Sequence, residues 1–370
     1  MPRWNRELVG IVIVAFLLRV GVAIIFPMGA KYDLVSYRLV GEAVLNGENV
    51  YQVLPDRYPY FPGWMLIEAL AKLVADSLGI PFWLVIRLPQ IAADATIVVV
   101  IYEFIKQNLS ESDLSPLQGA AFHTFNPAAI AVIGGHGQFD SLPILALILS
   151  IGFVLLGRDD LSAVVLGLGI ALIFMGLLLL GYLSNTRSRI RYFLLAAAPT
   201  AILSIPFLLL SPVAYIQSTL GYSSGALMSW LTPLLLVEAV ATPPGAALGI
   251  PFPNIPQGVI LTITKFGYLA SVLVVSWLFW KKDRYGYNIS LWSASLLIVL
   301  LFYTISAALA AQYPYWAMPF LPLVSLSNRY RIGLMFSGFA VSALWYTKSY
   351  ALSGEITFNI IVLSVYGLFV

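Results

Sequence analysis

Long apolar stretches alternate with short polar ones along the whole chain. Most of the apolar stretches reach the ~17 to 25 residues that a helix needs to cross a bilayer. They are residues 8–27, 62–79, 82–105, 117–134, 141–157, 161–183, 192–210, 259–280, 288–310, 314–327, 332–347 and 356–370. No polar stretch between them is long enough for a separate globular domain. The pattern therefore predicts an all-α polytopic membrane protein with a single transmembrane domain, residues 1–370.

Two of these stretches are expected not to cross. Residues 62–79 carry Glu68, Lys72 and Asp76 at four-residue spacing, which places all three on one helical face. Such a helix is suited to lie at the membrane interface. Residues 161–183 are predicted to enter the membrane and return as two short halves, which leaves about ten full crossings.

The basic residues give the orientation, because Lys and Arg collect in cytoplasmic loops. Most of them fall on one side in this topology: Arg3, Arg6, Lys106, Arg158, Arg187, Arg189, Arg191, Lys281, Lys282, Arg284, Arg329 and Arg331. We therefore expect both termini in the cytoplasm, with the N-terminal segment as a retained signal anchor. The outer face then holds residues 28–81, 135–140 and 211–258.

The first outer loop, residues 28–81, is predicted to contain interfacial helices. Arg38 and Glu42 share one face of a helix over 35–44, and Gly47 supplies its stop. Its apolar face is formed by Val35, Leu39, Val40, Ala43 and Val44. The second outer loop, residues 211–258, is rich in proline and is expected to be an irregular cap over a cavity.

Composition excludes several classes of function. Of the 370 residues, 60% are hydrophobic and 10% are charged, against about 25% charged in a soluble chain. A net charge of +3, with no basic run among aromatic residues, argues against a nucleic-acid partner. The absence of cysteine excludes disulfides and thiolate chemistry, and two histidines leave little room for a histidine-built metal site.

Asp33 is the leading catalytic candidate because it lies just past the first apolar stretch, on the outer side. A carboxylate there can act as a general base on a hydroxyl group presented at the bilayer surface. The alternative is that Asp33 caps the helix that follows it.

Residues 134–141 form a glycine-rich turn between two apolar stretches, with four polar side chains: His136, Gln138, Asp140 and Ser141. Polar groups at a membrane boundary are costly and are often functional. The alternative is a plain polar hairpin in which Asp140 and Ser141 cap the next helix.

Two further groups are candidates. Arg19 lies roughly 12 Å inside the first stretch, so it should face either a phosphate or an acidic partner, Asp94 or Glu103. Residues 311–322 place Gln312 beside three aromatic residues, Tyr313, Tyr315 and Trp316. An aromatic belt at the membrane interface would account for Tyr315 and Trp316 without any function.

Taken in order along the chain, these motifs resemble the GT-C superfamily of membrane glycosyltransferases, and most closely the family that adds the first mannose to GPI precursors. The likeness rests on the acidic motif at Asp33, the pattern from Tyr37 through Gly41, Gly47 and Tyr51 to Arg57–Pro62, Asp94, Asn126-Pro127 with the turn 136–141, and Gln312-Tyr313…Trp316…Leu321-Pro322. Often two acids stand in the family's first loop, whereas one remains here.

The resemblance implies a GT-C-like helical bundle with an outward-facing cavity. It implies inverting transfer of a hexose, namely mannose, from a polyprenyl- or dolichyl-phosphate sugar to a lipid-linked acceptor, with Asp33 as the base. Donor phosphate and sugar would be bound by Arg19, Arg57, Tyr58, Tyr60, His136, Gln138, Asp140, Gln312, Tyr313 and Trp316. No cofactor is expected, and Asp33 with Asp140 is the one pair worth testing for a divalent metal.

The expected partners are the lipid donor, the lipid acceptor and the surrounding membrane lipids, with a small accessory membrane subunit as a further option. The location would be the plasma membrane of a prokaryote or the endoplasmic reticulum, with the active site on the outer or lumenal face. Two alternatives stay open: a transporter of lipids or small molecules, and a non-catalytic membrane subunit. A transporter should show related halves and ionisable pairs near the midplane, neither of which is clear in this sequence.

Overall fold

The computed structural model describes residues 6–172, 188–219, 273–275, 277, 281, 289–305 and 312–351. Within these ranges all regular structure is helical and no strand occurs. The all-α prediction is therefore confirmed for this part of the chain. Most of the predicted second outer loop, and the proposed turn inside 161–183, lie outside the described residues.

Three helical stretches are long and apolar enough to cross a membrane. They are α1 (Arg6–Ile25), the continuous stretch Phe82–Lys106 formed by α5 (Phe82–Val85) and α6 (Arg87–Lys106), and α12 (Arg189–Leu210). Shorter apolar helices include α9 (Ser141–Leu155) and part of α17 (Leu291–Ile305). By length and composition, these helices indicate a membrane protein.

The remaining helices are shorter or more polar. They are α2 (Lys31–Leu45), α3 (Val50–Val53), α4 (Gly63–Leu78), α7 (Pro116–Thr124), α8 (Pro127–Ala129), the π-helix η1 (Ile130–His136), α10 (Asp159–Leu172), α13 (Pro212–Thr219), the 3-10 helix η4 (Tyr313–Phe320) and α18 (Asn328–Ala351).

Two predicted apolar segments are not single helices. Residues 117–134 are interrupted after α7, where Asn126 caps α8 through the amides of Ala128 and Ala129 and Pro127 takes the first helical position. Proline lacks the amide that a continuous helix would need there. Residues 314–327 form only the short η4, which contains two prolines, followed by irregular chain.

The helix predicted over 35–44 is present as α2, and Gly47 follows its end with a φ of 73°. Arg38 and Glu42 are exposed as predicted. The buried face centres on Tyr37 and Gly41 and packs against α4.

The orientation predicted for α4 is wrong in one respect. Glu68 is fully buried, although Lys72 and Asp76 do share a face and form an ion pair. The reason is close helix packing: a Cβ at Gly41 would lie 2.6 Å from the backbone oxygen of Glu68. The two helices therefore approach at this point and enclose the acid.

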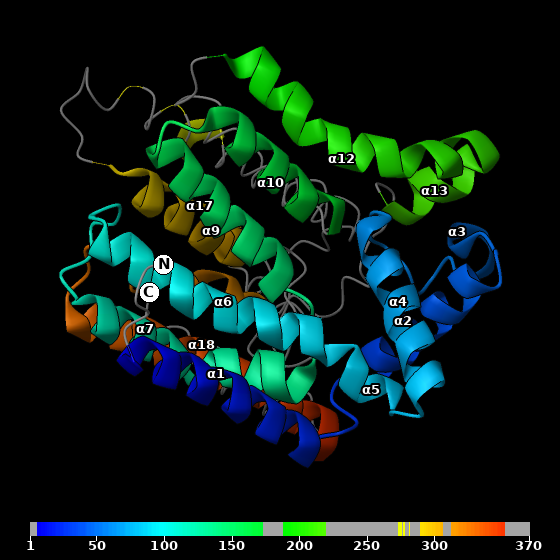
Figure 1. Ribbon diagram of the computed structural model, residues 1–370, viewed down its shortest axis with the longest axis horizontal. Helices are drawn as coiled ribbons and strands as arrows, with labels where there is room; N and C mark the ends of the chain where they lie inside the picture. Colours follow the sequence, from blue (N-terminus) through cyan, green and yellow to red (C-terminus); the bar gives the residue numbers. More distant parts are fainter. Residues whose placement is uncertain are drawn as a thin grey trace, which may run out of the picture.

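The arrangement of the helices sets the site at one end of the molecule. In Figure 1, α2, α3, α4 and α5 gather at the right, beyond the ends of the long helices α1 and α6. The chain returns to this end at the end of η1, where the carbonyl of His136 accepts a hydrogen bond from the amide of Ala30.

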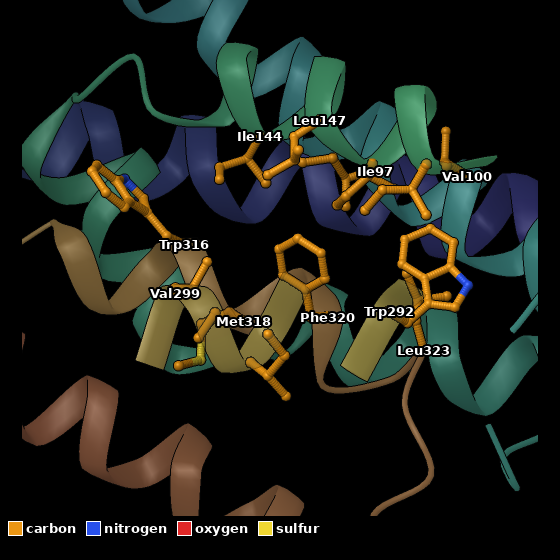
Figure 2. Packing of buried hydrophobic residues seen from close by; sticks show 14 of the residues in the cluster. Ile97, Val100, Ile144, Leu147, Trp292, Val299, Trp316, Met318, Phe320 and Leu323 are labelled. Carbon is orange, nitrogen blue, oxygen red and sulfur yellow. The ribbon is translucent and has the colours of Figure 1, made fainter. Parts of the chain in front are cut away.

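The main hydrophobic core lies between the long helices. Figure 2 shows Phe320 and Met318 of η4 near Trp292 and Val299 of α17, with side chains of α6 and α9 across from them. A second cluster, rich in aromatic residues, joins α2, α3 and α4 to Phe139. The two irregular segments that carry polar candidate residues are thus packed into the hydrophobic clusters: η4 into the first and the turn at Phe139 into the second.

Candidate functional site

Asp33 lies in the first turn of α2 and contacts the turn after η1. Its Oδ2 lies 3.2 Å from Nε2 of His136 and also accepts a hydrogen bond from the amide of Gln138. The N-cap of α2 is Ala30, which makes no side-chain cap, so the capping alternative for Asp33 is wrong. The carboxyl group of Asp33 lies at the end of α2 that carries partial positive charge.

Tyr37 orients Gln138. The Tyr37 hydroxyl donates to Oε1 of Gln138 at 2.7 Å, which turns the Nε2 of Gln138 toward Asp33 and to 3.1 Å from Nε2 of His136. Tyr37 and His136 are buried, whereas the side chain of Asp33 has a relative solvent exposure of 31%. Asp33 is therefore the member of this group that a ligand can reach.

Backbone contacts bring the two segments together. The amide of Ala30 donates to the carbonyl of His136 at 3.0 Å, directly before α2 begins. Gly137 has a φ of 80°, a conformation that glycine adopts without strain. The sharp turn at Gly137 lets His136 and Gln138 both reach Asp33.

Asp140 is the second carboxylate of the site, and it is buried. The indole of Trp316 donates to it at 2.5 Å, and Ser141 donates to the backbone oxygen of Gln90 at 2.7 Å. Asp140 stands at the N-cap position of α9, but its side chain makes no capping hydrogen bond, so the predicted capping by Asp140 and Ser141 is wrong. Burial raises the pKa of Asp140 to about 6, although the bond from Trp316 and the nearby His136 lower it.

Trp316 and Tyr315 are both buried, so the aromatic-belt interpretation of these two residues is wrong. The Tyr315 hydroxyl donates to Asp94 at 2.7 Å. Consecutive residues of η4 thus bond to two different aspartates, and Tyr313 packs against Trp316 with ring centroids 4.6 Å apart. Tyr313 and its neighbour Gln312 are half-buried.

Arg19 does not face the site. It is fully buried, forms an ion pair with Asp94 and donates to the backbone oxygen of Thr124 at 2.8 Å. His123 also contacts Asp94, at 2.9 Å. The structure thus selects Asp94 as the partner of Arg19, and the predicted phosphate contact of Arg19 is withdrawn.

Tyr58 is likewise structural. Its buried hydroxyl donates to the oxygen of Phe61 at 2.7 Å and accepts from the amide of Met65 at 2.8 Å, so its ring offers no open face. Tyr60 is half-buried and packs edge-on against Phe139 at 4.9 Å. Of the two tyrosines predicted to bind sugar, only Tyr60 stays a candidate.

Arg57 lies close to the site through α2. Its guanidinium stands over the ring of Tyr32 at 4.7 Å and donates to Ser36 at 3.1 Å. Ser36 is three residues after Asp33 on the same helix, so Arg57 contacts a position next to Asp33 on the surface of α2.

No group of three or more His, Asp or Glu side chains that could hold a metal ion occurs among the described residues. The contacts instead join Asp33, His136, Gln138 and Tyr37 in one cluster, with Asp140, Trp316 and Tyr313 beside it. No family model matches this chain, and no characterised protein or solved structure shows significant similarity to it.

Proposed function

We propose that this protein is a multi-pass membrane glycosyltransferase of the GT-C type. It transfers a hexose, mannose by resemblance, from a polyprenyl- or dolichyl-phosphate sugar to a lipid-linked acceptor. The observation that supports this most directly is the accessible carboxylate of Asp33, held by His136 and Gln138 just beyond the end of α1. A group at that position meets substrates that are anchored in a bilayer.

The two oxygens of Asp33 have different environments. Both partners contact Oδ2, while Oδ1 makes no hydrogen bond within the described part of the chain. Oδ1 takes the proton from the acceptor hydroxyl group while the hydroxyl oxygen attacks C1 of the sugar. The bond between C1 and the phosphate oxygen breaks in the same step, and its electron pair leaves with the phosphate. A single displacement of this kind inverts the configuration at C1.

The leaving phosphate needs cations and hydrogen-bond donors rather than a strong acid. Arg57 supplies a permanent cation on the α2 side, while the buried His136 orients Asp33 from behind. The half-buried rings of Tyr60 and Tyr313 are the surfaces for the sugar, and Gln312 is a further donor. Asp140 and Trp316, which are hydrogen-bonded to each other, shape the wall of the sugar site between Tyr60 and Tyr313.

Membrane orientation is part of the proposal. The N-terminus lies in the cytoplasm, α1 crosses, and Asp33 stands on the outer or lumenal side. That side is the periplasmic or external face in a prokaryote and the lumen in the endoplasmic reticulum.

A donor assay tests the proposal. The purified protein, in detergent with a membrane lipid extract as acceptor, is incubated with radiolabelled polyprenyl-phosphate hexoses or with nucleotide sugars. Lipid-phosphate sugars should transfer label, with full activity in EDTA. Turnover of a nucleotide sugar, or activity that EDTA abolishes and manganese restores, would contradict the proposed mechanism.

A further inference from the structure

Arg87 is a fully buried arginine that lies between the two segments of the candidate site. It is the first residue of α6. Its Nη1 lies 3.0 Å from the backbone oxygens of Ala23 and of Phe26, and 3.4 Å from that of Gly134. One guanidinium group thus bonds to the end of α1 and to the last turn of η1, two residues before His136.

The position of the guanidinium is favourable with respect to α1, whose last carbonyl groups lack partners within the helix and carry partial negative charge. The guanidinium carbon also stands 5.7 Å from the ring centre of Trp83. Arg87, a residue of the neighbouring helix α6, therefore caps the C-terminal end of α1.

Two glycines show how tightly the chain encloses Arg87. A Cβ at Gly137 would lie 2.5 Å from Nε of Arg87. A Cβ at Gly29 would overlap the same guanidinium group and would lie 2.6 Å from the carbonyl oxygen of His136. Gly29 precedes Asp33 by four residues, and Gly137 lies between His136 and Gln138. Both segments that carry the site thus contact one side chain.

We propose that Arg87 is a positioning residue that fixes the distance between Asp33 and the pair His136 and Gln138. The proposal rests on the function proposed above, in which Asp33 is the base. Arg87 touches no reacting group in this account. It acts by holding residues 26–30 against the turn 134–137, so that Oδ2 of Asp33 is held and Oδ1 points to the acceptor.

The test compares Arg87→Lys and Arg87→Gln with Arg331→Lys. Arg331 is a matched control, because it is also fully buried and donates to backbone oxygens, those of Leu321 and Val324. It also pairs with Asp113, and none of these partners belongs to the candidate site. Two readouts are taken on the full-length protein in detergent: transfer kinetics, and hydrogen exchange of the peptides that cover residues 26–34 and 133–138.

Arg87→Lys keeps the charge but loses the planar fork, so we expect kcat to fall by about 100-fold, the loss that a displacement of about 1 Å can cause. KM for the lipid-phosphate donor should stay close to the wild-type value. Exchange should accelerate in both site peptides, including at the amide of Ala30. Arg331→Lys should leave kcat and the exchange of the two site peptides unchanged. Arg87→Gln should lower kcat and accelerate exchange more than Arg87→Lys does.

Equal exchange in the Arg87→Lys and Arg331→Lys proteins at the two site peptides would overturn the inference. A loss of kcat that merely follows a loss of folded protein, measured by thermal unfolding, would overturn it too. If Arg87→Gln does not fold, Arg87→Lys alone decides. If the wild type transfers no sugar from any donor, the proposed function fails, while the exchange comparison still tests the positioning role.

Discussion

At Asp33, both partners contact the same oxygen, although 103 and 105 residues separate them from it along the chain. This arrangement fixes the side chain and leaves the other oxygen for a substrate. Nε2 of His136 also lies 3.1 Å from Nε2 of Gln138, so moving one of these side chains disturbs the other. Coupled polar groups of this kind are worth more together than their separate contacts suggest.

The ion pair of Arg19 and Asp94 leads to a prediction about stability. Arg19→Met alone leaves the buried Asp94 without its cation, and breaking a buried pair costs about 3–5 kcal/mol. Arg19→Met combined with Asp94→Leu should cost clearly less, because the uncompensated charge is gone. Thermal unfolding in detergent measures both. Equal destabilisation by the single and the double variant would argue against a coupled pair.

Sequence reasoning found the acids and the turn residues because polar groups are rare in so apolar a chain. It could not choose the partner of Arg19, because that choice depends on how α1 and α6 are rotated about their axes. Arg87 was missed, since a basic residue near the end of an apolar stretch is usually a solvated loop residue. Tyr37 is part of the pattern that runs to Pro62, but its bond to Gln138, 101 residues away, depends on tertiary packing that the pattern does not contain.

On the scale of single elements, α4 shows how packing can override a helical charge pattern. Glu68, Lys72 and Asp76 do share a face, but the approach of α2 at Gly41 encloses the first of them. The exposed face of α4 carries Leu66, Leu70 and Leu73 instead, which suits a helix lying at a membrane interface. The prediction of an interfacial helix therefore stands as a prediction, but it now rests on the exposed leucines of α4 and not on a solvated row of charges.

Burial raises the pKa of Glu68 well above its usual value, although the neighbouring Trp64 lowers it. Above the unfolded-state pKa near 4.5, the folded protein therefore binds more protons than the unfolded chain. Stability should then fall as pH rises through the raised pKa of Glu68. Glu68→Met should remove that fall and stabilise the protein by about 1–3 kcal/mol at alkaline pH.

Thermal unfolding across pH, with Glu42→Met as the control, checks this prediction. Glu42 is exposed on α2 and should show no such effect. A Glu68→Met protein that is less stable than the wild type at every pH would indicate that the carboxyl group makes a stabilising contact.

The irregular segments were the least predictable elements. Residues 117–134 and 314–327 are apolar enough to be taken as continuous helices, yet Pro127, Pro314 and Pro319 interrupt them. These interruptions place the polar turn and η4 beside each other at the site, through the bond between Trp316 and Asp140. The prolines could have given this warning from the sequence alone.

On the scale of the whole molecule, three of the described helical stretches are long and apolar enough to cross a membrane, and the orientation is a prediction from charge. Gln52 and Ser77 are exposed in the first outer segment, and Gln107 is exposed after α6. Because the chain has no cysteine, single cysteines at these positions can be labelled without background.

In intact cells or sealed vesicles with the outer face accessible, an impermeant maleimide should label Gln52→Cys and Ser77→Cys. It should label Gln107→Cys only after permeabilisation. If Ser77→Cys were protected while Gln52→Cys was labelled, α4 would have to cross the membrane, and the proposed topology would be wrong.

The central claim, that Asp33 is the base of a sugar transfer, is tested most directly by the turnover of the Asp33→Asn protein with a polyprenyl-phosphate hexose. Asparagine has nearly the same shape and can still accept a hydrogen bond at the position of Oδ2, but it cannot take the acceptor proton. General-base catalysis is worth at least ~100-fold, so turnover should fall by that factor or more, with donor binding and thermal stability nearly unchanged. Asp140→Asn should cost less. An Asp33→Asn protein that transfers sugar at close to the wild-type rate would contradict the account.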